Sequence, residues 1–150
     1  MSIGALATKA ARAAARLRRE LGVGPTEAIC PFDVAETLSI PVRLVALPSL
    51  EGMYSPSPTP TIIVSVERPI GRRRYTCGHE LGHHVFGHGT RLDEFSDEDS
   101  TTWSPEEFLA HRFAAALLMP KLAVESAFAR QGWSIGTPTP DTIFVVAREL

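Results

Sequence analysis

The sequence predicts an α+β fold that is mostly helical, with a small β-sheet bordering a histidine-rich helix. Alanine-rich segments, or segments with helically spaced apolar residues, cover much of the chain: 5–21, 30–40, 105–119, 121–131 and 141–150. Two segments rich in β-branched residues, 42–47 and 61–67, have strand composition. The segment HELGHHVFGHG (79–89) follows the second strand and holds four of the five histidines of the chain.

Length and composition are those of a single globular domain, 1–150. The chain is 44% apolar and 21% charged, with a formal charge of −2, so it has no general attraction to nucleic acid or membranes. No segment approaches the roughly 18 apolar residues of a membrane span, and the N-terminal segment lacks the pattern of a secretory leader. Cys30 and Cys77 match no metal or redox spacing. We therefore expect a cytoplasmic protein with two reduced thiols.

The first half of the chain begins with a helix that ends at Leu21-Gly22, a helix stop signal. This helix is basic, but no aromatic residue is interleaved with its charges, so a solvated face is favoured over a nucleic-acid surface. A short helix with Pro31 at its entry and strand 42–47 follow. A proline-rich loop, 48–60, leads to strand 61–67, which is expected to border the cleft and could pair with an extended peptide.

The second half contains a polar segment, 89–103, that is predicted to be a solvated loop. The residues SPEE (104–107) have the N-cap, the proline and the early acidic residues of a helix start. A helix over 121–131 comes next, and the last helix is expected to open with Asp141 as its cap.

The pattern HExxH is formed by His79, Glu80 and His83. On a helix with about 100° per residue, the two histidines are about 40° apart around the axis and about 6 Å apart along it, so their imidazoles can reach one point. Two such histidines suit zinc, and the glutamate beside them suits a general base acting on water. Ordinary surface histidines are the alternative interpretation.

The other side of this helix is expected to pack on the core. Cys77, Leu81 and Val85 fall on that side. His84 and His88 point away from the ligand face and are expected to lie in solvent or to support the ligands from behind.

A catalytic zinc site needs a third protein ligand and an open position for water. Glu107 is the predicted ligand, and Glu106 is the fallback. Glu107, Ala110, His111 and Ala114 form one helical stripe of otherwise small residues that could face the histidine helix closely. The competing carboxylates lie in the predicted loop, where nothing holds them: Asp93, Glu94, Asp97, Glu98 and Asp99.

A donor for the developing oxyanion is also needed. Tyr75 on the metal side of the helix, Tyr54 in the proline-rich loop and His84 are the candidates.

These motifs make the chain similar to the ImmA/IrrE family of metallopeptidases. RYTCGHELGHHVFGH (74–88) resembles the family's R-F-T-L-A-H-E-L-G-H with a following histidine, and EFLAHRFAAALLMP (107–120) resembles its E-x-x-A-N-x-F-A-A-x-L-L-M-P. The resemblance covers most of 5–131 in order. It implies a minimal, zincin-like metalloprotease domain of the gluzincin type, with His79, His83 and Glu107 as metal ligands and Glu80 as the catalytic base.

The chain departs from the family pattern at a few places. His111 stands where the family usually has asparagine, one turn from the acidic ligand, where it could orient a ligand imidazole. Cys77 and Gly78 replace Leu-Ala. Family members normally continue beyond a helix like 141–150, which predicts a C-terminally truncated or minimal form.

The resemblance also implies a substrate. Family members typically cut a helix-turn-helix transcriptional repressor encoded beside them, in a response to stress or in mobile elements. Zinc is the expected metal, and manganese or iron also fits two histidines and a carboxylate.

Two alternative functions remain open at this point. In one, the protein binds a repressor or other regulator without cutting it, and the metal is structural or vestigial. In the other, the basic N-terminal helix and the arginines at 72–74 form a nucleic-acid-binding regulator, which the composition disfavours.

Overall fold

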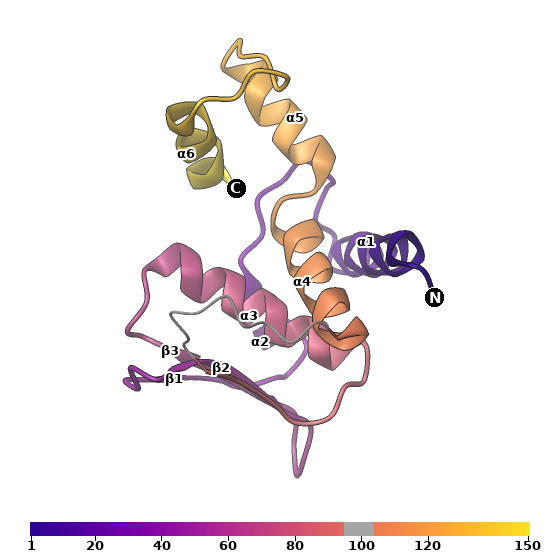
Figure 1. The fold of residues 1–150 in the computed structure, drawn as a ribbon, viewed down its shortest axis with the longest axis vertical. Helices are drawn as coiled ribbons and strands as arrows, with labels where there is room; N and C mark the ends of the chain where they lie inside the picture. The colour runs from indigo at the N-terminus through magenta and orange to yellow at the C-terminus, as the bar shows by residue number, and fades with distance from the viewer. Residues whose placement is uncertain (95–103) are drawn as a thin grey trace.

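The computed structural model describes residues 1–94 and 104–150, and within them it has an α+β architecture (Figure 1). The elements in chain order are α1 (Ile3–Glu20), α2 (Pro31–Thr37), β1 (Val42–Val45), β2 (Leu50–Ser55), β3 (Thr61–Ser65), α3 (Ile70–Val85), β4 (Arg91–Glu94), α4 (Pro105–Leu118), α5 (Lys121–Arg130) and α6 (Pro140–Glu149). The expected helices and both expected strands are present, so the predicted fold class is confirmed.

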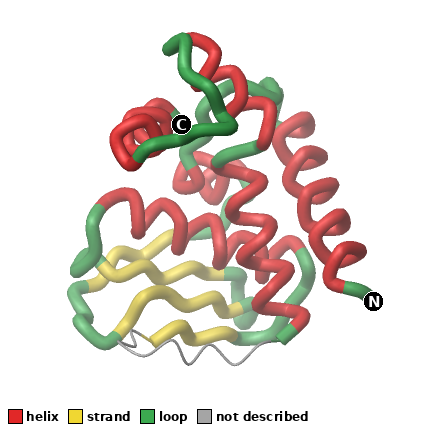
Figure 2. Tube along the Cα trace, turned by 45° about the horizontal axis from the view of Figure 1, so that its top comes forward, coloured by secondary structure: helices red, strands yellow, loops and turns green. Residues whose placement is uncertain are grey.

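The four strands form one mixed sheet in the order β1-β3-β2-β4 (Figure 2). β1 and β3 are parallel, whereas β2 pairs antiparallel with both β3 and β4. Two of these strands were not predicted: β2 lies in the proline-rich segment, and β4 lies in the segment expected to be a solvated loop. Because β3 has a strand on each side, the expectation that it could take up an extended peptide is wrong. β4 is the edge strand at the other end of the sheet from β1.

Helix α3 lies between the sheet and helix α4. It packs on β2 and β3 on one side and on α4 on the other, and α1 lies against the far side of α4 (Figure 1). This central position explains why both polar and apolar faces of α3 are buried. Cys77 and Leu81 are in the core as predicted, but Val85, in the last turn, is 37% exposed.

Small residues set the distance between α3 and α4. Gly78 faces Ala114, and Gly82 faces Ala110 so closely that an added Cβ would lie 2.9 Å from the Ala110 Cα. The stripe predicted on α4 therefore does pack against the histidine helix. Phe113 and Leu117 fill the core on the neighbouring face of α4.

Most of the buried apolar side chains from α1 to α4 and the sheet form one hydrophobic cluster. A second, smaller cluster joins α5 to α6 and includes Phe128 and Val146. α6 begins one residue earlier than expected, because Thr139 rather than Asp141 is its N-cap and Pro140 takes the first helical position. Among the described residues, no helix combines the length and the apolar character needed to cross a membrane.

Candidate metal centre

The two histidines of the HExxH pattern lie side by side on the buried part of α3. His79 is 2% exposed and His83 is fully buried. Their Nε2 atoms are 3.1 Å apart, and the ring planes are nearly perpendicular. The spacing of one helical turn has therefore brought two nitrogen donors to a common point, as predicted.

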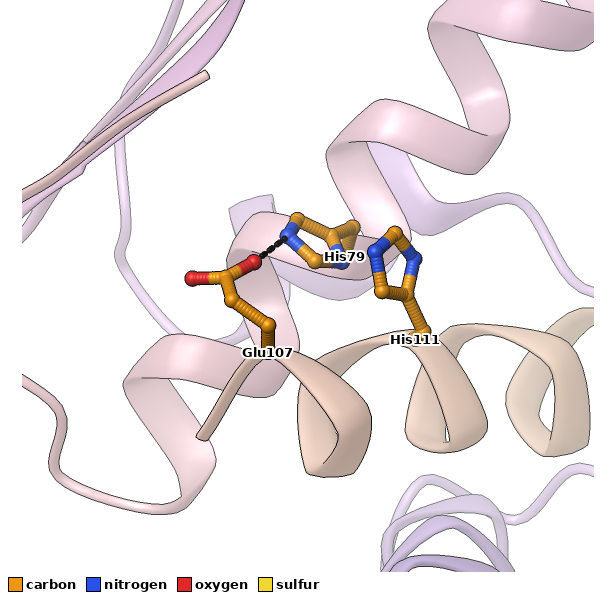
Figure 3. A group of neighbouring side chains, drawn as sticks. All are labelled: His79, Glu107 and His111. Carbon is orange, nitrogen blue, oxygen red and sulfur yellow. Dashed lines mark ion pairs between the residues drawn. The ribbon is translucent and has the colours of Figure 1, made fainter. Parts of the chain in front are cut away.

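Glu107 reaches the same point from the first turn of α4. Its Oε2 lies 3.2 Å from the His79 Nε2 (Figure 3). Its Oε1 lies 3.5 Å from the His83 Nε2. The predicted N-cap, Ser104, holds this turn in place, because its Oγ accepts a hydrogen bond from the Glu107 backbone N–H at 3.1 Å. Contact with the two imidazoles keeps the pKa of Glu107 well below its ordinary value, so this side chain is a carboxylate at neutral pH.

His88 supports His83 from behind. Gly87, with φ of 68°, ends α3 in the left-handed conformation and turns the chain so that the His88 N–H donates to the His83 carbonyl. The Nδ1 atoms of His83 and His88 are then 2.8 Å apart. Burial and the nearby His83 lower the pKa of His88 to about 4, so His88 is neutral and can accept the His83 Nδ1–H. This bond leaves the His83 Nε2 free as a metal donor.

Glu80 is fully buried beside the two histidines. Within the described part of the chain, the ionised Glu80 carboxylate has no hydrogen-bond donor, whereas protonated Glu80 hydrogen-bonds Asp93. Gly52 of β2 makes room for it, since a Cβ at that position would lie 2.7 Å from the Glu80 Oε1. Burial and the neighbouring Asp93 carboxylate raise the pKa of Glu80 well above its ordinary value, which favours a group that takes up and returns a proton.

Asp93, a competing carboxylate that the sequence placed in a loop where nothing would hold it, is held on strand β4 beside the histidines. It lies on β4, with its Oδ2 at 3.1 Å from the His79 Nε2, and one ligand atom from each of His79, Glu80 and Asp93 falls within 4.8 Å of the others. Burial alone would lower the pKa of His79, but the hydrogen bonds that its ring donates to the Asp93 and Glu107 carboxylates outweigh burial and raise it to about 9. Asp97, Glu98 and Asp99, the other loop carboxylates, lie outside the described residues.

His111 lies one turn after Glu107 and beside His79, with the ring centroids 4.3 Å apart and the ring planes tilted by 43° (Figure 3). It does not orient His79 by the expected hydrogen bond. Its Nδ1 instead lies 2.9 Å from the Tyr75 hydroxyl, while the His79 Nδ1 is buried and has no partner among the described residues. If Tyr75 donates, the proton of neutral His111 is on Nε2.

The other candidate donors form a separate pair. Tyr54 lies on β2 rather than in a loop and is 2% exposed. Its hydroxyl is 3.0 Å from the Nδ1 of His84. Glu106, the fallback ligand, forms an ion pair with Arg91 of β4 instead of joining the histidines.

The donor set fits a divalent metal ion. Two imidazole nitrogens and a carboxylate are the ligands of known catalytic zinc sites. Three carboxyl groups, those of Glu80, Asp93 and Glu107, gather in a largely buried site, where a cation would stabilise their ionised forms. The unpartnered oxygens of Glu80 are polar atoms that such a site, with its water, would satisfy.

Residues 35–148 match the family described as the IrrE N-terminal-like domain, Peptidase_M78. This range contains all of the metal-centre residues described above. A search among curated proteins found no match to the chain.

Proposed function

Since the chain belongs to the IrrE N-terminal-like peptidase family and has a zincin-like α+β fold, we propose that it is a zinc-dependent endopeptidase. The observation that carries this proposal is the meeting of the His79 and His83 Nε2 atoms with the Glu107 carboxylate, at separations of 3.1 to 3.5 Å. A metallopeptidase-like function is supported by the family itself. The choice of zinc follows from the two imidazoles, and manganese or iron would fit the same donors.

In this mechanism His79, His83 and Glu107 would hold the ion, which would supply Lewis acidity toward water and toward the peptide carbonyl. Glu80 takes the proton of the attacking water and returns it to the departing amine. Its burial suits this role, because a raised pKa lets one carboxyl group act first as base and then as acid.

His111 is our candidate for stabilising the developing oxyanion. Tyr75 positions it through the 2.9 Å contact with its Nδ1, so that Nε2–H is available to donate. Tyr54 and His84 bond each other, and we assign them a structural role.

We propose a helix-turn-helix repressor as the substrate, cut in the cytoplasm during a response to stress or within a mobile element. This assignment rests on the resemblance of residues 74–88 and 107–120 to the ImmA/IrrE motifs.

The decisive experiment is co-expression with the regulator encoded beside the protein, followed by mass spectrometry of the regulator. We expect cleavage with the wild-type protein and none with Glu80→Gln, which keeps the shape of the side chain but cannot accept the proton. Glu94→Gln is the matched control, since Glu94 is an exposed acid on β4. Elemental analysis should find zinc in the wild-type protein and much less in His79→Ala and Glu107→Ala. Inactivation of the regulator that proceeds unchanged with the Glu80→Gln variant would refute the proposed peptidase activity.

One observation favours the second candidate, a regulatory binding protein with a structural metal: Asp93 lies close enough to His79 to complete the coordination without water. The Glu80→Gln variant separates the two functions, because binding without cleavage does not need a base. The nucleic-acid alternative receives no such support. Arg18, Arg73 and Arg74 donate to backbone carbonyls within the chain, and Arg72 pairs with Glu51.

A further inference from the structure

Edge strand β4 directs two charged side chains toward the metal centre. Arg91 and Asp93 are partly buried, whereas Leu92 and Glu94 are exposed. Alternate residues of a strand face opposite sides, so Arg91 and Asp93 share the face that looks toward α3 and α4. Each has a partner there: Arg91 pairs with Glu106, and Asp93 contacts His79.

An irregularity in the neighbouring strand sets this orientation. The pairing of β2 with β4 runs from Leu50 opposite Glu94 directly to Gly52 opposite Asp93, so Glu51 is an extra residue in the ladder. A shift of one residue in pairing turns every side chain of a strand to the other face. The bulge therefore places Asp93 opposite Gly52, whose missing side chain leaves space beside Glu80.

The distances around His79 are those of ligands around one ion. In a tetrahedral zinc site with bonds of about 2.0 to 2.2 Å, neighbouring donor atoms are about 3.3 to 3.6 Å apart. The separation of Asp93 Oδ2 from His79 Nε2 is 3.1 Å, equal to that between the two histidine nitrogens and close to the 3.2 Å for Glu107. Asp93 is thus placed like Glu107 with respect to His79, although Glu107 also contacts His83, whereas Asp93 contacts His79 alone of the two histidines.

Glu80 provides an independent indication that an ion or water belongs here. It is fully buried, it lies within the same group of donors as His79 and Asp93, and its two oxygens lack a donor among the described residues unless Glu80 is protonated and shares its proton with Asp93. Two carboxyl groups that approach each other inside a protein repel unless a proton or a cation lies near them.

We propose that Asp93 is a fourth protein ligand of the metal and that it occupies the position a working peptidase keeps open. The inference rests on the proposed metallopeptidase function and adds that the enzyme is inactive while Asp93 fills this position. With two histidines and two carboxylates the coordination is closed, as in structural zinc sites. The Arg91–Glu106 ion pair ties β4 to the start of α4 and holds Asp93 in place. Activity then requires the Asp93 side chain to withdraw from His79.

The test compares the wild-type protein with Asp93→Ala, Asp93→Asn and the control Glu94→Gln, each loaded with cobalt(II) in place of zinc. Visible absorption of cobalt reports its ligands and geometry. Acetohydroxamic acid, a small bidentate ligand, is the probe for an open position. Asp93→Asn keeps the shape of the side chain, so it decides the question if Asp93→Ala does not fold. Zinc affinity is measured by competition with a chromophoric chelator.

We expect acetohydroxamic acid to leave the wild-type and Glu94→Gln spectra unchanged and to shift the spectra of both Asp93 variants. Zinc affinity should fall by at least about tenfold in Asp93→Ala, while cleavage of the regulator should become faster. Equal spectral shifts in all four proteins, or unchanged zinc affinity in the Asp93 variants, would overturn the inference and leave the peptidase intact. A wild-type protein that takes up neither zinc nor cobalt would refute the proposed function itself.

Discussion

Gly82, inside the HExxH pattern, controls how closely Glu107 can approach the histidines, and replacing it with alanine tests this directly. The new Cβ would lie 2.9 Å from the Ala110 Cα and 3.1 Å from the Ala110 carbonyl oxygen. Carbon atoms prefer separations of about 3.5 to 4.0 Å. Because the obstacle is backbone, α4 must move away from α3 by about 0.5 to 1 Å.

This movement has two measurable effects. Overpacking costs about 1 to 3 kcal/mol, and the better helix propensity of alanine returns about 0.5 to 1 kcal/mol. The net loss, about 1 to 2 kcal/mol near the middle of these ranges, predicts a fall in Tm of about 2 to 8 °C for a chain of this size. Metal ligands tolerate displacements of about 0.2 Å, so we expect zinc affinity to fall at least about tenfold.

Gly78→Ala is the matched control, because Gly78 lies on the same helix and faces the same partner. Its added Cβ would meet Ala114 and Leu118 at 3.5 Å, an ordinary contact. We expect Tm to stay constant or rise by up to about 4 °C, with zinc affinity unchanged. Circular dichroism with chelator present gives Tm, and chelator competition gives affinity. Equal effects of the two substitutions, or a Gly82→Ala protein that matches the wild type, would refute this account of the helix contact.

The zinc affinity of His88→Ala should be about 10- to 100-fold weaker in chelator competition, because the His83 Nδ1 loses its acceptor; unchanged affinity would contradict the role given to His88. Zinc binding should release a proton at pH 7, since the pKa of His79 is raised to about 9 and the ion must displace that proton. The apparent zinc affinity should therefore rise with pH up to about 9. A calorimetric binding enthalpy at pH 7 that does not depend on the buffer's ionisation enthalpy would contradict this proton release. Iodoacetamide should modify the half-buried Cys30 of the native protein but not Cys77, because burial raises the pKa of the Cys77 thiol to about 12. Mass spectrometry detects the label, and labelling of Cys77 in the native protein would contradict its burial.

The helices and the HExxH donors could be predicted because their signals are local. Ser104 caps α4 and Gly87 closes α3 through contacts within a few residues, and the spacing of His79 and His83 fixes their convergence before any packing is known. Predicting Glu107 as the third ligand also required the stripe of small residues on α4, which indicates that α4 can approach α3 closely. In the structure, this close approach occurs where Gly82 packs against Ala110.

The two missed strands depend on partners far away in sequence. β2 contains a glycine and lies between prolines, so its composition indicates a loop, and only its pairing with β3 and β4 makes it a strand. β4, with the sequence RLDE, contains no β-branched residue. Without β4 in the prediction, nothing could bring Asp93 to His79.

Even if β4 had been predicted as a strand, its side chains would have been assigned to the wrong faces of the sheet. Apolar residues of a half-buried strand normally face the core, which would place Leu92 inside and Asp93 in solvent. The structure does the reverse, and Leu92 is 56% exposed. Leaving half of a leucine in water forgoes about 1 kcal/mol of the ~2 kcal/mol that full burial provides. A local rule that is broken at such a cost indicates a functional constraint, and the group that gains the buried position is the carboxylate beside His79.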